Sequence, residues 1–448
     1  MTRFDPSGPL HGSLRPPSDK SISHRAALIA AMGEGETVVE GYLDAADTRS
    51  TLAAVDALGA RVVAGTETRT IAVSKNWTGP LPPVRSDLGL GLRIEGVGLR
   101  GARPAPIDVG NAGTLLRLLP GWLAGQEGGH WTLDGDESIR RRPVDRITVP
   151  LRRMGANLSC REDRLPPLEI EGTTLHGATY EMPIASAQVK SCLLFAGLLA
   201  GGETRVIESL PSRDHTERML AAAGAPIERV DDAVVVRPVE QLQPDPIVVP
   251  ADISSAAFFI AAALLVEQSD VVLFEVNVNP TRTGLLTILE RMGAAIAVED
   301  EREVGGEPIA RLRVRSAPLQ ATEVGGVEIP LAIDELPLVA LAACFAEGTT
   351  TIRDAAELRH KESDRIETVT AALRVLGGKV EATPDGMVIE GAGSLRGGAI
   401  DSHGDHRIAM LGAVAGLVSE EGVEVRGMDA AAVSYPGFER DLAALLSR

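Results

Sequence analysis

The sequence predicts an α/β protein of two domains, assembled from six copies of one unit of helices and strands. Three observations predict this fold class. A polar start followed by a run rich in Ala and Leu occurs six times along the 448 residues. An amphipathic stretch that closes on Gly and leads into a strand-like segment follows most of these runs. Proline-marked breaks divide the six units into three and three.

The six apolar runs have the pattern of buried helices. A residue type that favours a helix N-cap precedes each run, and each run is apolar on nearly every side. With 3% aromatic residues and 47 glycines, these helices must pack through aliphatic side chains with close backbone approach. The runs begin at Ser23, Asn111, Ser186, Asp252, Asp334 and Gly404.

The second type of segment predicts an amphipathic helix followed by a strand. A glycine just past the last helical turn is typical of a helix C-terminus, and β-branched residues after it favour a strand. Because one such segment is common in any α/β protein, the prediction depends on its repetition. The glycines are Gly59, Gly155, Gly224, Gly293 and Gly377, and a sixth segment, from Phe438, reaches the end of the sequence.

The proline-marked breaks, at residues 15–19 and 243–252, predict where two domains meet. We expect repeats one to three over residues 19–249 and repeats four to six over residues 250–448. We also expect the first strand, within residues 1–18, to return to the second domain. That last expectation comes only from the family resemblance given below.

Composition and charge exclude several classes of protein. Lys and Arg total 44 against 62 Asp and Glu, a net charge of −18, whereas nucleic acids and anionic membranes bind cationic surfaces. The longest apolar run, 256–266, is far below the roughly 18 residues of a membrane span. Cys160, Cys192 and Cys344 fit neither a disulfide framework nor a zinc spacing. We therefore expect a soluble, cytoplasmic protein with reduced thiols.

The few lysines mark a candidate anion site. Only five of the 44 basic residues are lysine, and three of them fall in the polar segments beside the buried helices. Helix N-termini carry unpaired N–H groups and a positive dipole end, which favour anions. The lysines are Lys20, Lys75, Lys190, Lys361 and Lys379, and the neighbouring arginines are Arg25, Arg117, Arg365 and Arg407. We expect Lys20, Lys190 and Lys361 to contribute to one cationic site.

Two further segments suggest chemistry. In ELRHKESDR, residues 357–365, the side chains of Lys361, Glu362 and Arg365 are expected on one helical face, although a solvated surface helix has the same pattern. Three consecutive arginines, at 140–142, repel one another unless an anion or nearby acids offset their charge. Asp334 opens an apolar helix, where it can cap the helix or act as a general base in a cleft.

The motifs together resemble the 5-enolpyruvylshikimate-3-phosphate synthase family. They occur in the family's order over nearly the whole chain. The motifs are DKSISHR at 19–25, GNAGT at 110–114 with Arg117, Arg-Pro at 142–143, SAQVKS at 186–191, PSRDHTE at 211–217, IDELP at 333–337, KESDR at 361–365 and GDHR at 404–407. The resemblance implies two domains, each of three βαβαββ units, in an arrangement called an inside-out α/β barrel.

The resemblance also implies a reaction. The enolpyruvyl group of phosphoenolpyruvate is transferred to the 5-hydroxyl of shikimate 3-phosphate, and phosphate is released. Neither a metal ion nor an organic cofactor is implied, and the expected partners are these two small anions. We expect a monomer that binds neither nucleic acid nor a membrane.

Motif positions imply the roles of individual residues. Asp334 would take the 5-hydroxyl proton, and Glu362 or Lys20 would protonate the enolpyruvyl methylene. Shikimate 3-phosphate would be bound by Lys20, Ser21, Arg25, Ser186, Ala187, Gln188, Arg213, Asp334 and Lys361. Phosphoenolpyruvate would be bound by Lys20, Gly113, Arg142, Gln188, Arg365 and Arg407.

Three positions depart from the family pattern. Val433 stands where many members have Lys, Leu118 where others have Pro, and Ala187 where others have Ser. Inhibitor sensitivity therefore cannot be transferred from the family. Gly113, which has no side chain, is expected to leave room for the inhibitor glyphosate.

Because both halves carry cations, we expect like charges to hold the cleft open until anionic substrates neutralise them. Two other functions remain open. A related enolpyruvyl transferase acts on UDP-N-acetylglucosamine, but it typically carries a catalytic cysteine in a mobile loop, and no cysteine here lies in a Gly-rich polar loop. A non-catalytic anion-binding repeat protein would explain the repeats but not the combination of Asp334, Lys361 and Glu362.

Overall fold

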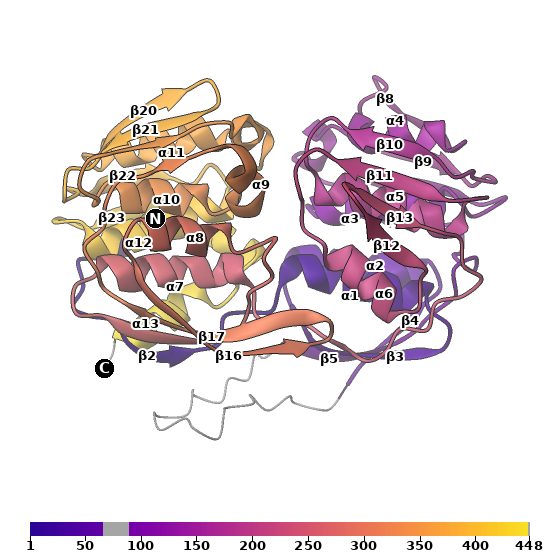
Figure 1. The fold of residues 1–448 in the computed structure, drawn as a ribbon, viewed down its shortest axis with the longest axis horizontal. Coiled ribbons are helices and arrows are strands. Elements are labelled where there is room, and N and C mark those ends of the chain that lie inside the picture. The colour runs from indigo at the N-terminus through magenta and orange to yellow at the C-terminus, as the bar shows by residue number, and fades with distance from the viewer. Residues whose placement is uncertain (66–88, 447–448) are drawn as a thin grey trace.

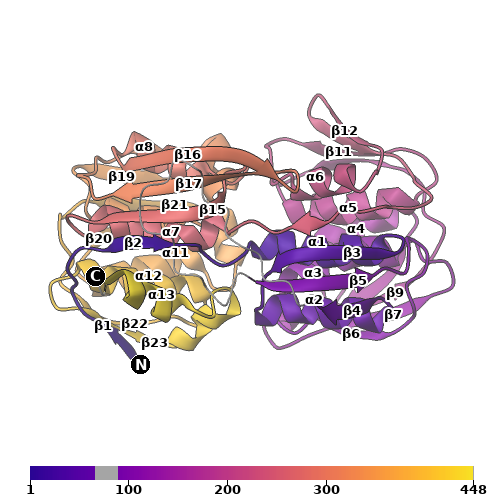
Figure 2. The same cartoon turned by 90° about the horizontal axis from the view of Figure 1, so that it is seen from below.

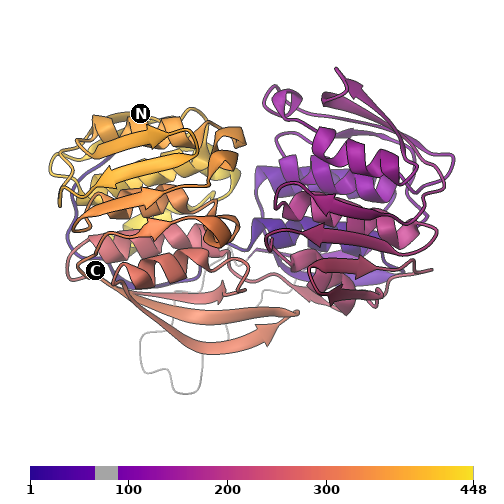
Figure 3. The same ribbon diagram turned by 45° about the horizontal axis from the view of Figure 1, so that its top comes forward.

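The computed structural model describes residues 1–65 and 89–446, and Lys75 lies outside these ranges. Its two halves lie side by side and are joined along one edge (Figure 1). In each half, helices form the centre and sheets form the outside (Figure 3). Within the described residues, no helix is both long and apolar enough to cross a membrane.

The predicted unit is complete in the second and third repeats. In each sheet, the first two strands are parallel and the last two are antiparallel to their neighbours, giving the orders β6-β7-β9-β8 and β10-β11-β13-β12. One repeat contains β6 (Pro106–Asp108), α3 (Gly113–Leu123), β7 (His130–Asp134), α4 (Asp145–Arg153), β8 (Asn157–Arg161) and β9 (Leu165–Glu171). The next contains β10 (Thr179–Met182), α5 (Ala187–Leu199), β11 (Thr204–Glu208), α6 (His215–Ala222), β12 (Ile227–Val230) and β13 (Ala233–Val236). The predicted βαβαββ unit is thereby confirmed.

The first and fourth repeats exchange their first strands. The first contains α1 (Lys20–Met32), β3 (Glu36–Tyr42), α2 (Ala46–Ala57), β4 (Arg61–Ala64) and β5 (Leu90–Glu95). The fourth contains α7 (Ile253–Leu265), β15 (Asp270–Asn277), α8 (Gly284–Arg291), β16 (Ala295–Val304) and β17 (Glu307–Arg315). β2 (His11–Leu14) pairs in parallel with β15, and β14 (Ile247–Val248) pairs in parallel with β3. The strand before α1 therefore lies in the second half, and the strand before α7 lies in the first half.

The last two repeats complete the second half. The fifth contains β18 (Glu323–Val324), α9 (Ile329–Ala332), α10 (Leu336–Ala343), β19 (Thr349–Ile352), α11 (Arg365–Val375), β20 (Lys379–Thr383) and β21 (Gly386–Glu390). The sixth contains β22 (Gly398–Asp401), α12 (His406–Val418), β23 (Val423–Arg426) and α13 (Phe438–Leu446). Its sheet has three strands in the order β1-β23-β22, and β1 (Thr2–Phe4) pairs antiparallel with β23. Figure 2 shows β1 and β2 in the same half as these repeats.

Two hydrophobic clusters form the cores, one in each half. One gathers side chains of residues 22–249, and the other gathers side chains of residues 253–445 together with Leu10 and Leu14. The two chain connectors, 15–19 and 249–252, run side by side, since each donates a backbone hydrogen bond to the other. We propose on this basis that the domain limits lie in these two connectors.

The six predicted buried helices are α1, α3, α5, α7, α10 and α12, and the helix prediction is confirmed. Four of them begin at a side-chain cap, supplied by Asp19, Ser186, Asp252 and Asp405. Helices α3 and α10 begin without one. Asp334, just ahead of α10, is therefore not needed to cap it.

The predicted helix ends are also present. Gly59, Gly155, Gly224, Gly293 and Gly377 have φ between +84° and +103°. Only glycine adopts this region at little cost, so these five positions end five amphipathic helices and turn the chain into the following strands.

Candidate active site

A cavity of about 610 Å³ lies between the two halves, where the N-terminal ends of buried helices meet. Helices α1, α3 and α5 line it from the first half, and α7, α11 and α12 line it from the second. From the described part of the chain, nine cationic side chains and five carboxylates reach it. Within the described ranges, no group of three His, Cys, Asp or Glu side chains is arranged to hold a metal ion. The cavity therefore suits anionic ligands.

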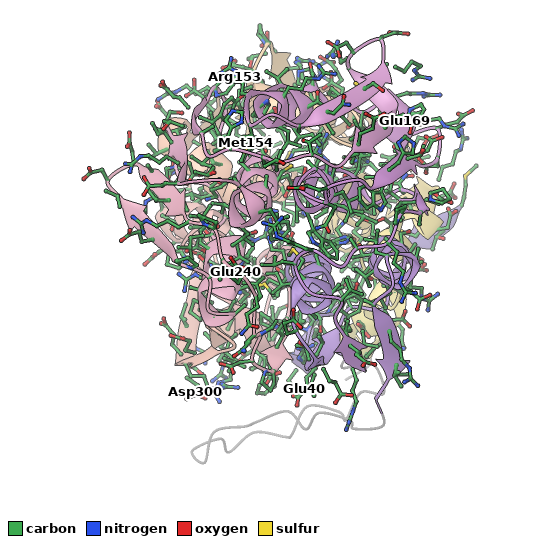
Figure 4. The ribbon with its side chains drawn as sticks, turned by 90° about the vertical axis from the view of Figure 1, so that its right-hand side faces the viewer. Glu40, Arg153, Met154, Glu169, Glu240 and Asp300 are labelled. Carbon is green, nitrogen blue, oxygen red and sulfur yellow. The ribbon has the colours of Figure 1, made fainter. Side chains whose placement is uncertain are left out.

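The charge of the cavity is opposite to that of the chain, which has a net charge of −18. Figure 4 views the molecule from the side of the first half and labels the acidic residues Glu40, Glu169, Glu240 and Asp300, together with Arg153 and Met154. Glu240 and Asp300 are exposed. Positive charge is thus concentrated between the halves, while the exterior carries acidic side chains.

Asp334 lies at the centre of the cations. Its carboxylate contacts Arg213 of the first half, and it lies 3.3 Å from both Lys361 and Arg365 of the second half. Arg407 Nη1 donates to the backbone oxygen of Asp334 at 2.9 Å. Burial alone would raise the pKa of Asp334, but the nearby positive charges hold it well below its ordinary value. The carboxylate is therefore ionised, although the same positive charges weaken it as a base.

Glu362 is the second carboxylate of the centre. Arg365 donates to Glu362 Oε2 at 2.6 Å and to Asp405 Oδ2 at 2.9 Å, and Arg142 Nη1 lies 3.6 Å from Glu362 Oε1. Burial alone would raise the pKa of Glu362, but Arg365 and Arg142 hold it well below its ordinary value. Glu362 is therefore also ionised when no substrate is bound.

Lys361, Glu362 and Arg365 do not share a helical face, so that prediction is wrong. Helix α11 begins only at Arg365, because Asp364 accepts a hydrogen bond from Glu367 N and caps it there. Lys361 and Glu362 lie ahead of it, in the connection between η3 (Ala356–His360) and α11. All three side chains nevertheless line the cavity, two of them from this non-helical connection and Arg365 from the first position of α11.

The first half contributes the starts of α1 and α5. Lys20 and Ser21 line the cavity, and Lys20 Nζ lies 3.1 Å from Asp47 Oδ2. Residues 186–188 line it at the start of α5, and Gln188 Oε1 accepts a hydrogen bond from Arg117 Nη1 at 2.7 Å. The predicted binding residues of DKSISHR and SAQVKS that line the cavity are therefore Lys20, Ser21, Ser186, Ala187 and Gln188.

Among the three consecutive arginines, Arg142 lines the cavity. The other two are offset by acids at the surface, since Arg140 lies 2.7 Å from Asp134 and Arg141 lies 3.2 Å from Glu137. The expected repulsion is therefore relieved by neighbouring carboxylates for two of the three.

Two predicted binding residues lie behind the lining. Among the described residues that line the cavity, neither Arg25 nor Gly113 is found. Arg25 is buried and donates to Thr216 Oγ1 at 2.7 Å and to the backbone oxygen of Ser21 at 2.9 Å. Gly113 lies against Arg142, because a Cβ at this position would be 2.6 Å from Arg142 Nη1. Both therefore contact residues that do line the cavity.

Lys190 does not contribute to the cavity. It is fully buried, 3.0 Å from Glu208 and 2.6 Å from Glu217, so two carboxylates neutralise its charge. The expectation that this lysine joins the cationic site is wrong, because its side chain leaves α5 toward α6 and not toward the cavity.

The halves attract each other across the cavity. Arg142 lies near Glu362, Arg213 contacts Asp334, and Arg146 donates to Glu357 at 2.6 and 3.1 Å. Each pair joins a cation of the first half to a carboxylate of the second. Pairs of opposite charge therefore also face each other across the cavity, and the expectation that like charges hold the cleft open until substrates bind stays a prediction.

A profile of the EPSP synthase (3-phosphoshikimate 1-carboxyvinyltransferase) family matches residues 4–84 and 84–442. The chain belongs to the EPSP synthase family. It is similar to the 3-phosphoshikimate 1-carboxyvinyltransferase of Gloeobacter violaceus, with 49% identity over 441 residues that cover 98% of this chain and 97% of the relative. The corresponding enzyme of Synechococcus sp. (strain RCC307) is 48% identical over 446 residues, which cover 98% and 97%.

The fold agrees with solved members of the EPSP synthase family. An EPSP synthase structure from Acinetobacter baumannii has a TM-score of 0.84 and 40% identity, covering 99% of this chain and 98% of that one. The chain is therefore a transferase with the two-domain α/β fold of this family. Its reaction is transfer of the enolpyruvyl (1-carboxyvinyl) group to 3-phosphoshikimate.

The departures from the EPSP synthase pattern differ in their distance from the cavity. Ala187 lines it, whereas Leu118 is buried within α3 and Val433 ends η4 (Met428–Val433). Neither Leu118 nor Val433 is among the lining residues in the described part of the chain. Of the three substitutions, Ala187 is the one placed to act directly on a ligand.

Sequence reasoning left several lining residues of this EPSP synthase family member without a role. Glu357 is the first residue of the segment 357–365 quoted above, and Arg146 lies four residues after Arg142. Their closeness to Lys361 and Arg142 in the sequence was a signal that could have been used. His406 lies between Asp405 and Arg407 of GDHR; burial and then the charge of Lys20 lower its pKa to about 3, so it is neutral at pH 7. Asp252, Ser254 and Arg282 also reach the cavity. The sequence marked Asp252 only as the start of a buried helix, and it did not mark Ser254 or Arg282.

Proposed function

We propose that the protein joins the enolpyruvyl group of phosphoenolpyruvate to the 5-hydroxyl of shikimate 3-phosphate in the cavity between its halves. One observation carries this proposal: cations from both halves surround a single ionised carboxylate, Asp334. Two anionic substrates need many cations, and deprotonation of a hydroxyl needs a base. The cavity supplies both in one place.

Shikimate 3-phosphate would lie on the side of α1 and α5. The residues proposed to bind it are Lys20, Ser21, Arg25, Ser186, Ala187, Gln188, Arg213, Asp334 and Lys361. All of these except Arg25 line the cavity, and Arg25 holds the backbone of Ser21. Ser186 uses its oxygen to accept from Val189 N, which leaves its O–H free to donate to a phosphate.

Phosphoenolpyruvate would lie between the two halves. The residues proposed to bind it are Lys20, Gly113, Arg142, Gln188, Arg365 and Arg407. The arginine forks match the two oxygens of a carboxylate or phosphate, which fixes both substrates for attack. Gly113 would contribute indirectly. Because it has no Cβ, the guanidinium of Arg142 has room to lie beside it.

Groups in the cavity can supply and accept every proton that the transfer requires. Asp334 takes the proton of the 5-hydroxyl, and the hydroxyl oxygen forms a bond to C2 of phosphoenolpyruvate. The methylene of phosphoenolpyruvate gains a proton from Glu362 or Lys20, which makes C2 electrophilic. Phosphate then leaves from C2, taking up the proton held by Asp334. The group that protonated the methylene, Glu362 or Lys20, takes a proton back from the new methyl group, which restores the double bond in the product.

Glu362 must become protonated before it can act as the acid. Its low pKa depends on Arg365 and Arg142, and both are proposed to bind phosphoenolpyruvate. A bound phosphate and carboxylate would offset these positive charges and raise the pKa of Glu362. Substrate binding would thus prepare the proton donor.

The test is phosphate release by the purified protein with phosphoenolpyruvate and shikimate 3-phosphate. Parallel reactions contain UDP-N-acetylglucosamine as acceptor, or no acceptor. We expect release only with shikimate 3-phosphate. Release with the UDP-sugar, or release in none of the three reactions, would contradict the proposal.

We further infer that the protein works as a cytoplasmic monomer. All proposed binding residues come from one chain, and the described cysteines are free thiols, two of them buried. Light scattering during gel filtration at several protein concentrations should give one mass near 47.0 kDa. A concentration-dependent dimer would contradict this inference.

A further inference from the structure

The amide of Gln188 is held from two sides. Arg117 Nη1 donates to Gln188 Oε1 at 2.7 Å, and Gln188 Nε2 donates to Thr114 Oγ1 at 3.1 Å. An arginine has only donors, so it can face only the oxygen of an amide. The side-chain amide of Gln188 therefore has one stable orientation, with its oxygen toward Arg117.

The contact is built into the packing of two helices. Thr114 and Arg117 are three residues apart in the first turns of α3, so they lie on one face of that helix. Gln188 is the second residue of α5. The helices approach closely where Gly121 meets Cys192, since a Cβ on Gly121 would be 2.0 Å from Cys192 O. Close packing therefore fixes where the two helix starts meet.

Arg117 is in an electrostatically unfavourable position. Burial, and then the charges of Arg142 and Arg146, lower its pKa to about 10, so it stays charged at neutral pH. Among the described residues, no hydrogen-bond partner is found for its buried Nε. A cation kept here despite like-charged neighbours indicates a role beyond neutralising an acid.

We propose that Arg117 and Thr114 are positioning residues that orient the amide of Gln188 for the reaction. This inference rests on the proposed function, in which Gln188 binds both anionic substrates. One N–H of the amide is used on Thr114, and the second is then left to donate into the cavity. A flipped amide would present its oxygen to the anions instead, and the hydrogen bond would become a repulsion.

The experiment is a double-mutant cycle in kcat/KM for phosphoenolpyruvate, measured by phosphate release. Arg117→Met should lower kcat/KM about 10-fold or more, mainly through a higher KM, because a hydrogen bond to a charged group is lost. In a Gln188→Ala background, the same Arg117→Met change should cost less than about 2-fold. An effect of Arg117→Met that persists undiminished in that background would overturn the proposal.

Arg146→Met is the charge-matched control. Arg146 also lines the cavity, but both of its terminal nitrogens donate to Glu357 and not to Gln188. Its effect should multiply with that of Gln188→Ala, whereas the effect of Arg117→Met should not. Equal behaviour of the two arginine variants would show that Arg117 acts through charge alone and would overturn the proposal.

Thr114 provides a second test that keeps the fold. Thr114→Val keeps the shape of the side chain and removes its oxygen, whereas Thr114→Ser keeps the oxygen. We expect a raised KM in Thr114→Val and near-normal KM in Thr114→Ser, with unchanged thermal unfolding. A normal KM in Thr114→Val, or in Gln188→Ala, would overturn the positioning role. Either result is distinct from failure of the proposed function, in which the unmodified protein itself releases no phosphate.

Discussion

The boundary between the two halves has a closed side and an open side. On the closed side, beside the connectors, Arg15 donates to the backbone oxygen of Val249 at 3.1 Å. Nearby, His215 Nδ1 of the first half lies 2.7 Å from Glu307 Oε1 of the second half, with side chains 0% and 1% exposed. Glu307 also accepts from Asn277 and is therefore fully engaged by protein groups.

The open side is the cavity. Arg146 and Glu357 are 27% and 28% exposed, and Arg142 and Glu362 are 15% and 25% exposed. These pairs also join the two halves, but water reaches them. An anionic substrate can therefore compete with the carboxylate for the arginine of such a pair. His215 and Glu307 are buried, so no ligand in the cavity can compete for them.

One boundary can therefore hold the two halves together on one side and exchange binding partners on the other. Pairs sealed from water are costly to break, because each partner would be left as a buried polar or charged group. Pairs open to water are weak, since solvent competes for both partners. The closed side thus fixes the two halves together, and the open side exchanges protein carboxylates for substrate anions.

The strongest test of the open side is removal of its central charge. Asp334→Asn should lower kcat by about 10²–10⁴-fold, because the proposed base is lost. The measurement is phosphate release at saturating substrates. Asp354→Asn is the control, since Asp354 also lines the cavity but has no proposed role. A kcat of Asp334→Asn within about 10-fold of the unmodified protein would contradict the assignment of the base.

A smaller effect on the open side is expected from Gly113→Ala. The new Cβ would lie 2.6 Å from Arg142 Nη1, so the guanidinium must move. A lost charged hydrogen bond corresponds to a rise of about 10- to 100-fold in the KM for phosphoenolpyruvate. Glyphosate inhibition should weaken as well.

The control for Gly113→Ala is Gly8→Ala, because a Cβ there would have no neighbour within 4 Å. Steady-state kinetics with each substrate in turn would show whether the effect is specific to phosphoenolpyruvate. An equal rise in the KM for shikimate 3-phosphate would mean that the whole cavity is distorted.

On the closed side, the expected effect is on stability and depends on pH. Burial alone would raise the pKa of Glu307, but His215, Asn277 and Asn279 lower it from 4.5 to about 2. The unfolded chain therefore binds a proton more readily, so Glu307 stabilises the fold above about pH 4.5, and this stabilisation is lost as pH falls toward 2.

Glu307→Gln should lower the thermal unfolding midpoint at pH 7 and flatten its fall between pH 4.5 and pH 3. Differential scanning calorimetry of both proteins over this range is the measurement. Since Asp214 and Arg218 are close to this pair, Asp214→Asn serves as a control for general effects of charge. Parallel pH profiles for the two Glu307 forms would contradict the assigned stabilisation.

The repeated fold was predictable because its signals are local. A polar cap, an apolar run and a glycine such as Gly155 or Gly293 specify a helix and its end within one short window. The exchange of β2 and β14 between halves has no such signal. The pairing of Leu14 with Leu273 joins distant residues, and either half would accept an apolar strand.

The site was predictable where the motif fixed both the residue and its direction. Lys20 and Gln188 stand in the first turn of a helix, whose start opens into the cavity. Lys190 comes only two residues after Gln188, which places it on nearly the opposite side of α5. No local pattern in the sequence shows that Glu208 and Glu217 lie on that side. Which side a buried helix residue faces is set by neighbours far away in sequence.

The smallest effect, and the sharpest comparison of the two sides, is expected for Arg146 and Glu357. Because both are about a quarter exposed, their coupling in the free energy of unfolding should be about 0.2–1 kcal/mol and should weaken in salt. A double-mutant cycle with Arg146→Gln and Glu357→Gln at low and high salt measures it. The matching cycle with His215→Gln and Glu307→Gln should give a larger coupling that salt barely changes, since water does not reach that pair. Equal couplings with equal salt dependence would remove the distinction between an open and a closed side.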